Sequence, residues 1–133
     1  RALQESMITR VGADKDIKID VRILAATNKD LHKEIAEGRF REDLYHRLAV
    51  IVIKVPALND RREDIPLLIE HFIKKIASEQ GTQQKKFSPA AIKLLQQYNW
   101  TGNIRELRNV VERLIILGEN VVSENDVTLF TSK

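Results

Sequence analysis

Two stretches of almost unbroken apolar residues stand out along the chain, DVRILAAT at residues 20–27 and LAVIVIKV at residues 48–55. Short apolar runs rich in Val and Ile are typical of strands that are covered on both faces of a sheet. Between them, residues 30–38 and 40–48 carry apolar positions four residues apart, which is a helical interval. Strand, helices and strand in this order predict a crossover unit whose two strands pair in parallel.

The residues before the first apolar run predict a hairpin. Residues 7–20, MITRVGADKDIKID, hold two short β-like runs on either side of a Gly-Ala-Asp-Lys-Asp turn. The chain opens on RALQE, which has the pattern of the end of a helix and has no capping residue before it. We therefore expect the sequence to be a segment of a larger domain.

After Pro56 the pattern becomes helical. Residues 62–80 carry a single apolar stripe, and a second stripe follows Ser88, a good N-cap residue that precedes a proline at the first helical position. The sequence thus predicts an α/β region followed by a small helical domain. The predicted division is residues 1–56 for the α/β part, 57–66 for a linker and 67–133 for the helical domain.

The last long helix is expected at residues 103–118. Asn103 and Glu106 stand at capping-box spacing, and Gly118 ends the pattern. Its expected buried face comprises Ile104, Leu107, Val110, Val111, Leu114 and Ile115. Residues 123–127 predict a short final turn.

Composition narrows the classes of function. The 133 residues include 43% hydrophobic and 31% charged residues with a net charge of +3, and no run of like charge marks a nucleic-acid tail. No cysteine is present, so no disulfide framework or thiolate metal site is possible. No apolar run is long enough to span a membrane, and no signal peptide opens the chain. We expect a soluble protein of the reducing cytoplasm.

Thr27 and Asn28 end the first predicted strand. Ligands of open α/β sheets bind at the carboxyl ends of strands, where an Asn can orient a water or touch a phosphate. The alternative is that Asn28 or Asp30 only caps the next helix.

Arg41 and Arg47 lie six positions apart in RFREDLYHRL, so they leave a straight helix on different sides. Arg47 has a structural alternative as a helical partner of Asp43. Arg41 is near the helix start, where a cation opposes the helix dipole, and an anion from outside would account for it. Spacing alone favours a solvated helix face.

Arg105 lies in the first turn of the last long helix, where backbone N–H groups and a guanidinium can bind one phosphate. A surface arginine is the alternative. Residues 88–117 also resemble a helix-turn-helix, although Arg108 and Arg113 do not share one edge with Arg105. A helical DNA-binding or protein-interaction module therefore stays open. No GxxxxGK[ST] phosphate loop occurs in the sequence.

Four motifs in order carry a family resemblance: VRILAATNKDL, EGRFREDLYHRL, RREDIPLL and WTGNIRELRNVVERLIIL. With them the chain resembles, from residue 1 to about residue 127, the AAA+ ATPase domain of bacterial enhancer-binding proteins, the NtrC-like activators of sigma-54 RNA polymerase. The resemblance implies the back part of an AAA+ core, with parallel strands and crossover helices, followed by an all-helical lid. Walker A, Walker B and the GAFTGA loop are not among these residues.

The resemblance also implies roles for individual residues. Asn28 matches the sensor I residue, with Thr27 beside it, and Arg41 and Arg47 match two arginine fingers that reach the ATP of the neighbouring subunit. Arg105 matches sensor II on the lid. The resemblance further implies that the linker, residues 57–66, borders the adenine of ATP, with Ile65 as the expected apolar contact of the base. The hairpin of residues 7–20 matches a surface loop that couples nucleotide state to sigma-54.

As cofactor and partners, the resemblance implies ATP with Mg²⁺, a hexameric or heptameric ring, and sigma-54 RNA polymerase holoenzyme. Enhancer DNA would be bound only by a separate domain, and no membrane is involved. The family usually has Arg-Glu at the positions of Asn59 and Asp60, which puts an adenine-side role of Asn59 in doubt. Since the phosphate-binding motifs are not among these residues, we expect this chain alone to bind little ATP and to hydrolyse none.

Overall fold

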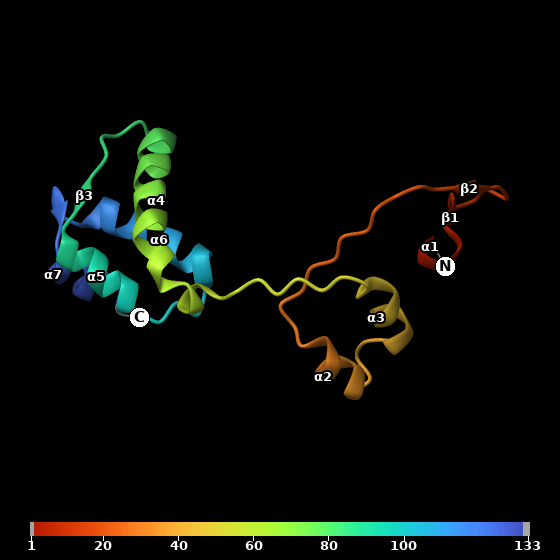
Figure 1. The fold of residues 1–133 in the computed structure, drawn as a ribbon. Coiled ribbons are helices and arrows are strands. Elements are labelled where there is room, and N and C mark those ends of the chain that lie inside the picture. The colour runs from red at the N-terminus through yellow and green to blue at the C-terminus, as the bar shows by residue number, and fades with distance from the viewer. Residues whose placement is uncertain (1, 132–133) are drawn as a thin grey trace. The chain divides into compact units, whose positions relative to one another are not determined.

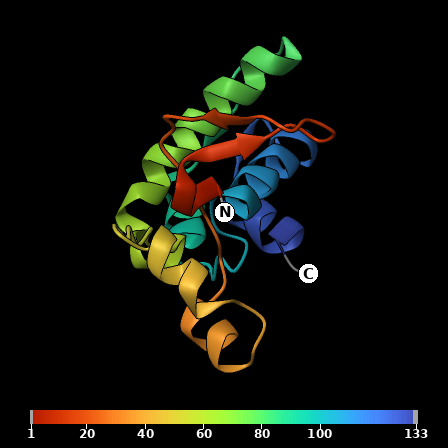
Figure 2. The ribbon, with the colours of Figure 1, turned by 90° about the vertical axis from the view of Figure 1, so that its right-hand side faces the viewer.

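The computed structural model describes residues 2–131, which divide between Lys54 and Val55 into two compact units (Figure 1). The first unit opens with α1 (Ala2–Glu5) and a hairpin of β1 (Met7–Thr9) and β2 (Asp16–Lys18), drawn in red in Figure 2. The two strands are antiparallel, with Met7 opposite Lys18. Gly12 has a φ of 82°, a left-handed conformation that suits glycine in the turn. The predicted hairpin is confirmed.

Two short helices follow in the first unit, α2 (Leu31–Ala36) and α3 (Glu42–Leu48). The Asp30 side chain caps α2 by accepting hydrogen bonds from the backbone N–H groups of His32 and Lys33. Gly38, with a φ of 71°, lies in the turn that follows α2. Both helices were predicted, and α3 begins two residues later than its apolar spacing indicated.

The prediction that residues 20–27 and 48–55 form paired strands is wrong for this structure. Neither segment belongs to a strand of the described residues, and apart from Leu48 and Ala49 at the end of α3 their apolar side chains are exposed, with Leu24 at 86% and Ile53 at 81%. A strand satisfies its backbone only through a neighbouring strand, whereas a helix does so within itself. The apolar pattern predicted a pair of strands, but no hydrogen-bonded ladder forms between these segments.

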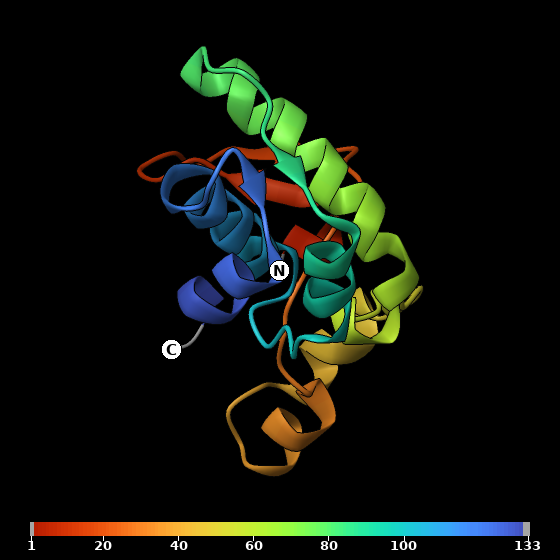
Figure 3. The same cartoon turned by 90° about the vertical axis from the view of Figure 1, so that its left-hand side faces the viewer.

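The second unit is mostly helical (Figure 3). Its elements are the 3₁₀ turns η1 (Leu58–Asp60) and η2 (Arg62–Asp64), then α4 (Ile65–Gln80), β3 (Lys86–Phe87), α5 (Pro89–Gln97), α6 (Asn103–Leu117), β4 (Val121–Val122) and α7 (Glu124–Thr131). The strands β3 and β4 pair in parallel, with Phe87 opposite Val122. This pair was not predicted, because two residues are too few to show a period.

The core of the second unit is built from the apolar stripes of α4, α5 and α6. The sole tryptophan, Trp100, is buried there, and its indole N–H donates to the Leu95 carbonyl over 2.9 Å. Five of the six residues expected to be buried on α6 are buried, whereas Ile104 is 41% exposed. The fully buried large side chains are Leu58, Ile65, Ile69, Ile76, Leu95, Trp100, Leu107, Val111, Leu114, Val122 and Val127.

Helix caps explain where α5 and α7 begin. The Ser88 hydroxyl accepts from the Ala91 N–H over 3.1 Å, as predicted. At α7, the Ser123 hydroxyl accepts from the Asp126 N–H while the Asp126 carboxylate accepts from the Ser123 N–H, a reciprocal capping box. This box starts a helix of eight residues where the sequence predicted only a short turn.

The fold class is confirmed as α/β elements followed by a helical lid. Residues 57–66, which the sequence assigned to a linker, contribute Leu58 and Ile65 to the core of the second unit. No helix in the described part of the chain is both long and apolar enough to cross a membrane.

Candidate nucleotide-sensing site

Arg41 occupies the N-cap position of α3, and its guanidinium forms a bidentate ion pair with Asp43. The Arg41 Nε lies 2.9 Å from the Asp43 Oδ1, and the Nη2 lies 2.7 Å from the Oδ2. The pair lowers the pKa of Asp43, with the Arg41 hydrogen bond as the main cause. The Arg41 side chain is 79% exposed, so water and salt weaken this pairing and the guanidinium can exchange to another anion.

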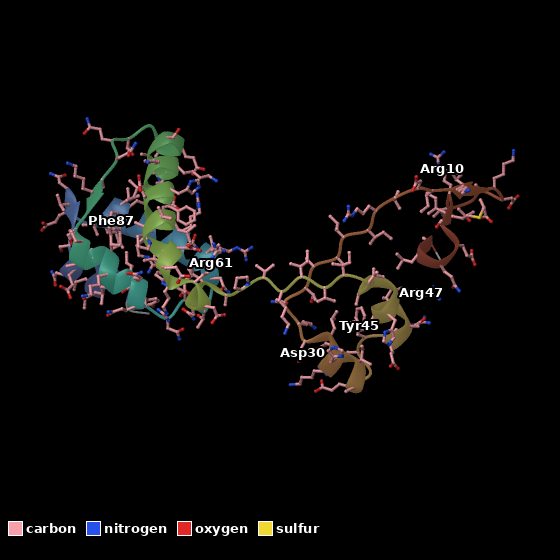
Figure 4. All side chains as sticks on the ribbon, in the orientation of Figure 1. Arg10, Asp30, Tyr45, Arg47, Arg61 and Phe87 are labelled. Carbon is pink, nitrogen blue, oxygen red and sulfur yellow. The ribbon has the colours of Figure 1, made fainter. Side chains whose placement is uncertain are left out.

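Arg47 lies in the last turn of α3, where a cation agrees with the helix dipole. The partner that spacing suggested, Asp43, is bound to Arg41 instead. Within residues 2–131, the Arg47 side chain is exposed and forms no hydrogen bond or salt bridge, although its charge contributes, after that of Arg41, to lowering the pKa of Asp43. In Figure 4, Tyr45 points toward α2 while Arg47 lies on the other side of α3. The structure therefore leaves Arg47 available to an anion from outside the unit.

A contact between α2 and α3 sets how this helix is presented. The Tyr45 hydroxyl lies 3.2 Å from the His32 Nε2, and the two rings are 5.0 Å apart. Arg39, in the connection between the helices, forms two hydrogen bonds with the Glu34 carboxylate, at 2.8 and 3.0 Å. This pairing lowers the pKa of Glu34. Sequence reasoning did not identify the His32–Tyr45 contact, because neither residue belongs to a local spacing pattern.

Thr27 and Asn28 precede α2. The Thr27 hydroxyl accepts from the Lys29 N–H over 3.1 Å, a local turn, while Asn28 is exposed and makes no hydrogen bond to the described residues. The cap of α2 is Asp30 rather than Asn28. Asn28 therefore does not cap α2 in this structure, and of its two alternatives only contact with a ligand stays open.

Arg105 lies in the first turn of α6, and its exposed side chain forms no hydrogen bond or ion pair with residues 2–131. The N-cap of α6 is Gly102, not Asn103. The Gly102 N–H donates to the carboxylate of Glu106, four residues along, over 2.8 Å, so the expected capping box of Asn103 and Glu106 does not form. A Cβ on Gly102 would lie 2.7 Å from the Glu106 Cβ, which explains the need for glycine here.

The Asn103 side chain does not cap α6, because it bonds to the backbone of Leu58, a residue distant in the sequence. Its Oδ1 accepts from the Leu58 N–H over 2.9 Å, and its backbone has a φ of 54°, in the left-handed region. Two further side chains of the linker contact the same turn. We call Asn59, Arg62 and Asn103 together the linker clasp, since they join residues 58–62 to the connection between α5 and α6.

Ile65 lies at the start of α4 and has no exposed surface in the core of the second unit. The side chain is therefore not open to a base in this structure. The basic residues of α6 other than Arg105 are also occupied. Arg108 pairs with Glu79 and Glu112, and Arg113 donates to the Phe130 carbonyl.

Among residues 2–131, no group of three or more potential metal-ligating side chains lies close together. Thr27, Asn28, Arg41 and Arg47 belong to the first unit, and Ile65 and Arg105 belong to the second. The exposed cations and the amide of these residues are suited to binding an anionic group, and they include no nucleophile with an adjacent base.

Comparisons with known proteins agree with this division. Residues 1–54 match a family described as the sigma-54 interaction domain, and residues 59–130 match the AAA+ ATPase lid domain. The chain is 49% identical over 131 residues to the transcriptional regulatory protein ZraR of Salmonella typhimurium, covering 97% of this chain and 30% of that protein. It is 50% identical over 117 residues to the nitrogen assimilation regulatory protein NtrX of Azorhizobium caulinodans, covering 88% and 26%.

Solved structures of NtrX from Brucella abortus are similar as well. One has a TM-score of 0.89 and 48% sequence identity, over 94% of this chain and 30% of that one. Another, in complex with ATP, has a TM-score of 0.81 and 52% identity, over 87% and 27%. The chain thus spans about 30% of the length of the curated relatives it matches.

Proposed function

This chain belongs to the NtrC-like sigma-54 activators of the AAA+ ATPases, and on that basis we propose that it senses bound ATP and supplies arginine fingers within the ATPase module. In this proposal the module hydrolyses ATP with Mg²⁺ in a hexameric or heptameric ring in the bacterial cytoplasm and remodels sigma-54 RNA polymerase holoenzyme. Enhancer DNA is bound by a separate domain. The observation that carries the proposal is the exposed Arg47 side chain, which forms no hydrogen bond or salt bridge within residues 2–131, in a segment that matches the sigma-54 interaction domain.

The proposal assigns a role to each candidate site residue. Arg41 and Arg47 act in trans, placing positive charge where the transition state of phosphoryl transfer gains negative charge. Asn28 acts as sensor I beside Thr27, and Arg105 acts as sensor II. The exchangeable pair of Arg41 with Asp43 suits a finger, because the guanidinium keeps a partner until a phosphate replaces the carboxylate.

The adenine-side role of Ile65 remains a prediction. Because this side chain is fully buried, it would have to act by packing beneath the linker rather than by touching the base. The hairpin of residues 7–20 is proposed to couple nucleotide state to sigma-54. Its tip carries Val11, whose side chain is fully exposed.

The test uses a chimaera in which residues 1–131 replace the matching segment of B. abortus NtrX, a relative crystallised with ATP. We expect Arg41→Ala and Arg47→Ala each to lower the rate of hydrolysis by about 10³-fold or more while ATP affinity is largely kept. Lys33→Ala is the matched control, because Lys33 is an exposed cation of α2 whose side chain forms no ion pair with the described residues. Equal loss of binding and hydrolysis would contradict a role in trans.

A mixing experiment tests the in-trans geometry directly. Subunits with Arg47→Ala are mixed with subunits whose Walker A lysine, supplied by the NtrX part, is replaced. An interface that combines an intact phosphate site with an intact finger from the other subunit exists only in the mixture, so activity should return on mixing. If the finger served its own subunit, the mixture would stay inactive.

The isolated chain provides a second test. A steady-state ATPase assay should show no turnover above background. Titration with duplex DNA at two salt concentrations separates the rival module, because a DNA-binding surface would show affinity with a steep salt dependence. Because Arg108 pairs with Glu79 and Arg113 donates to the Phe130 carbonyl, we expect little binding of DNA.

A further inference from the structure

The linker clasp joins two segments about forty residues apart in the sequence. Asn59 is its centre: the Oδ1 accepts from the Trp100 N–H over 2.9 Å and from the Arg62 Nη2 over 3.2 Å, and the Nδ2 donates to the Asn99 Oδ1 over 2.8 Å. Because two N–H donors converge on one atom of the amide, the network itself fixes which atom is the oxygen.

Arg62 reaches the end of α5 from the same segment. Its Nη1 donates to the carbonyls of Gln96 and Tyr98, at 2.8 and 2.6 Å, and the Gln96 side chain donates back to the Arg62 carbonyl over 3.0 Å. These carbonyls belong to the end of a helix, where they lack helical partners and where the helix dipole favours a cation. A lysine could not reproduce the geometry, since it has no planar fork of donors.

The far end of the turn is fixed by Asn103, which accepts from the Leu58 N–H and holds a left-handed backbone. The clasp therefore ties both ends of residues 98–103 to residues 58–62. Arg105 follows two residues later, exposed and unpaired within residues 2–131. No side chain of residues 2–131 bonds the Arg105 guanidinium, so the position of Arg105 depends on the backbone of this turn.

We infer that the linker clasp, with Asn59 as its positioning residue, sets the position of Arg105 so that a displacement of the linker is transmitted to sensor II. This inference rests on the proposed role of Arg105. It also gives position 59 a role that suits this chain, because the arginine usual in the family has no acceptor for the Trp100 N–H.

The test is a double-mutant cycle in the NtrX chimaera, read out as kcat and KM for ATP. Asn59→Ala should lower kcat by about tenfold or more, because a small misplacement of a catalytic group is costly. In an Arg105→Ala background the same substitution should change kcat by less than about twofold, since there is then nothing left to position. Asn109→Ala is the matched control, because the Asn109 side chain is exposed on α6 and makes no hydrogen bond to the described residues.

Rescue by a conservative variant separates positioning from folding. Asn59→Asp keeps the acceptor for Trp100 and Arg62 and loses only the donor to Asn99, whose amide can turn to offer its own NH₂ group. This variant should retain most of the wild-type kcat. Hydrogen exchange should show faster exchange at the Trp100 N–H in Asn59→Ala, with the buried amides of α6 unchanged.

Three results would overturn the inference. An equal loss of kcat from Asn59→Ala with and without Arg105 would show that the clasp does not act through Arg105, while the proposed function stands. Loss of protection throughout α6 would show a purely structural role. If Arg105→Ala itself left kcat unchanged, the proposed sensor II role would be wrong and the clasp would have no catalytic group to position.

Discussion

Both units of this chain contain runs of apolar residues, but only the second unit buries them. In the second unit the large apolar side chains of α4, α5 and α6 are buried against one another. In residues 2–54, by contrast, no side chain is buried, and the runs around Leu24 and Ile53 are exposed. The candidate fingers Arg41 and Arg47 and the candidate sensor I residue Asn28 lie in the unit without a core, and the candidate sensor II residue Arg105 lies in the unit with one.

The contrast shows what each kind of element needs. A helix completes its backbone hydrogen bonds internally and needs only a second stripe to pack against, which neighbouring segments of the second unit supply. A central strand needs a strand on each side before its apolar faces can be covered. Apolar residues alone therefore do not give a core, and the backbone must be satisfied as well.

The largest expected effect is at the core of the second unit. Leu114→Ala should lower the free energy of unfolding by about 3 kcal/mol or more, because the leucine is fully buried. Leu24→Ala, the same change at an exposed position of the first unit, should alter it by less than about 0.5 kcal/mol. Urea unfolding, followed by fluorescence of Trp100 for the second unit and by far-ultraviolet circular dichroism for the whole chain, measures both. Similar losses at the two positions would contradict the contrast.

Helix caps give an intermediate effect. Ser88→Ala removes the cap of α5 and should cost about 1 kcal/mol of stability in the second unit. Asp30→Ala removes the corresponding cap of α2 and should leave the Trp100 unfolding transition unchanged, while it reduces helical circular dichroism slightly. A shift of the Trp100 transition in Asp30→Ala would show that the two units unfold together.

A smaller effect is expected in acid. Hydrogen bonds, first of all from the Ser123 N–H, lower the pKa of Asp126 below its ordinary value of 3.8. The stability that this carboxylate contributes is therefore complete above 3.8 and is lost as the pH falls through the lower pKa of the folded state. The stability difference between wild type and Asp126→Asn should shrink over that window.

The first unit supplies the control for this pH dependence. The pKa of Asp43 is lowered as well, by Arg41. Asp43→Asn should nevertheless leave the acid profile of the Trp100 transition unchanged, because the pair lies on the exposed surface of the other unit. Acid titrations of both variants, followed by fluorescence, make the comparison.

Removal of the whole first unit is expected to have the smallest effect on the thermal unfolding of the second unit. A chain of residues 55–133 alone should unfold with the same midpoint as the whole chain, because its core is made entirely of its own residues. Thermal denaturation followed by near-ultraviolet circular dichroism provides the measurement. A large drop in the midpoint would show that the first unit stabilises the second.

Much of the second unit could be predicted because its signals are local. The stripes of α4 and α6, the Ser88 cap and the end of α6 at Gly118 all follow from residues within one helix. The exposed state of Arg47 and Arg105 agreed with their expected surface positions, whereas their roles came from the family motifs. The linker clasp could not be predicted, since its partners lie about forty residues apart.

By itself, the sequence determined the apolar stripes, the start of α5 at Ser88 and the family, because side-chain spacing and short motifs carry that information. Only the tertiary structure decided that Arg41 pairs with Asp43, that Asn103 serves Leu58 instead of capping α6, and that Ile65 is fully buried. A local pattern states which bonds a residue can make. Which bond forms depends on the partners that folding brings within reach.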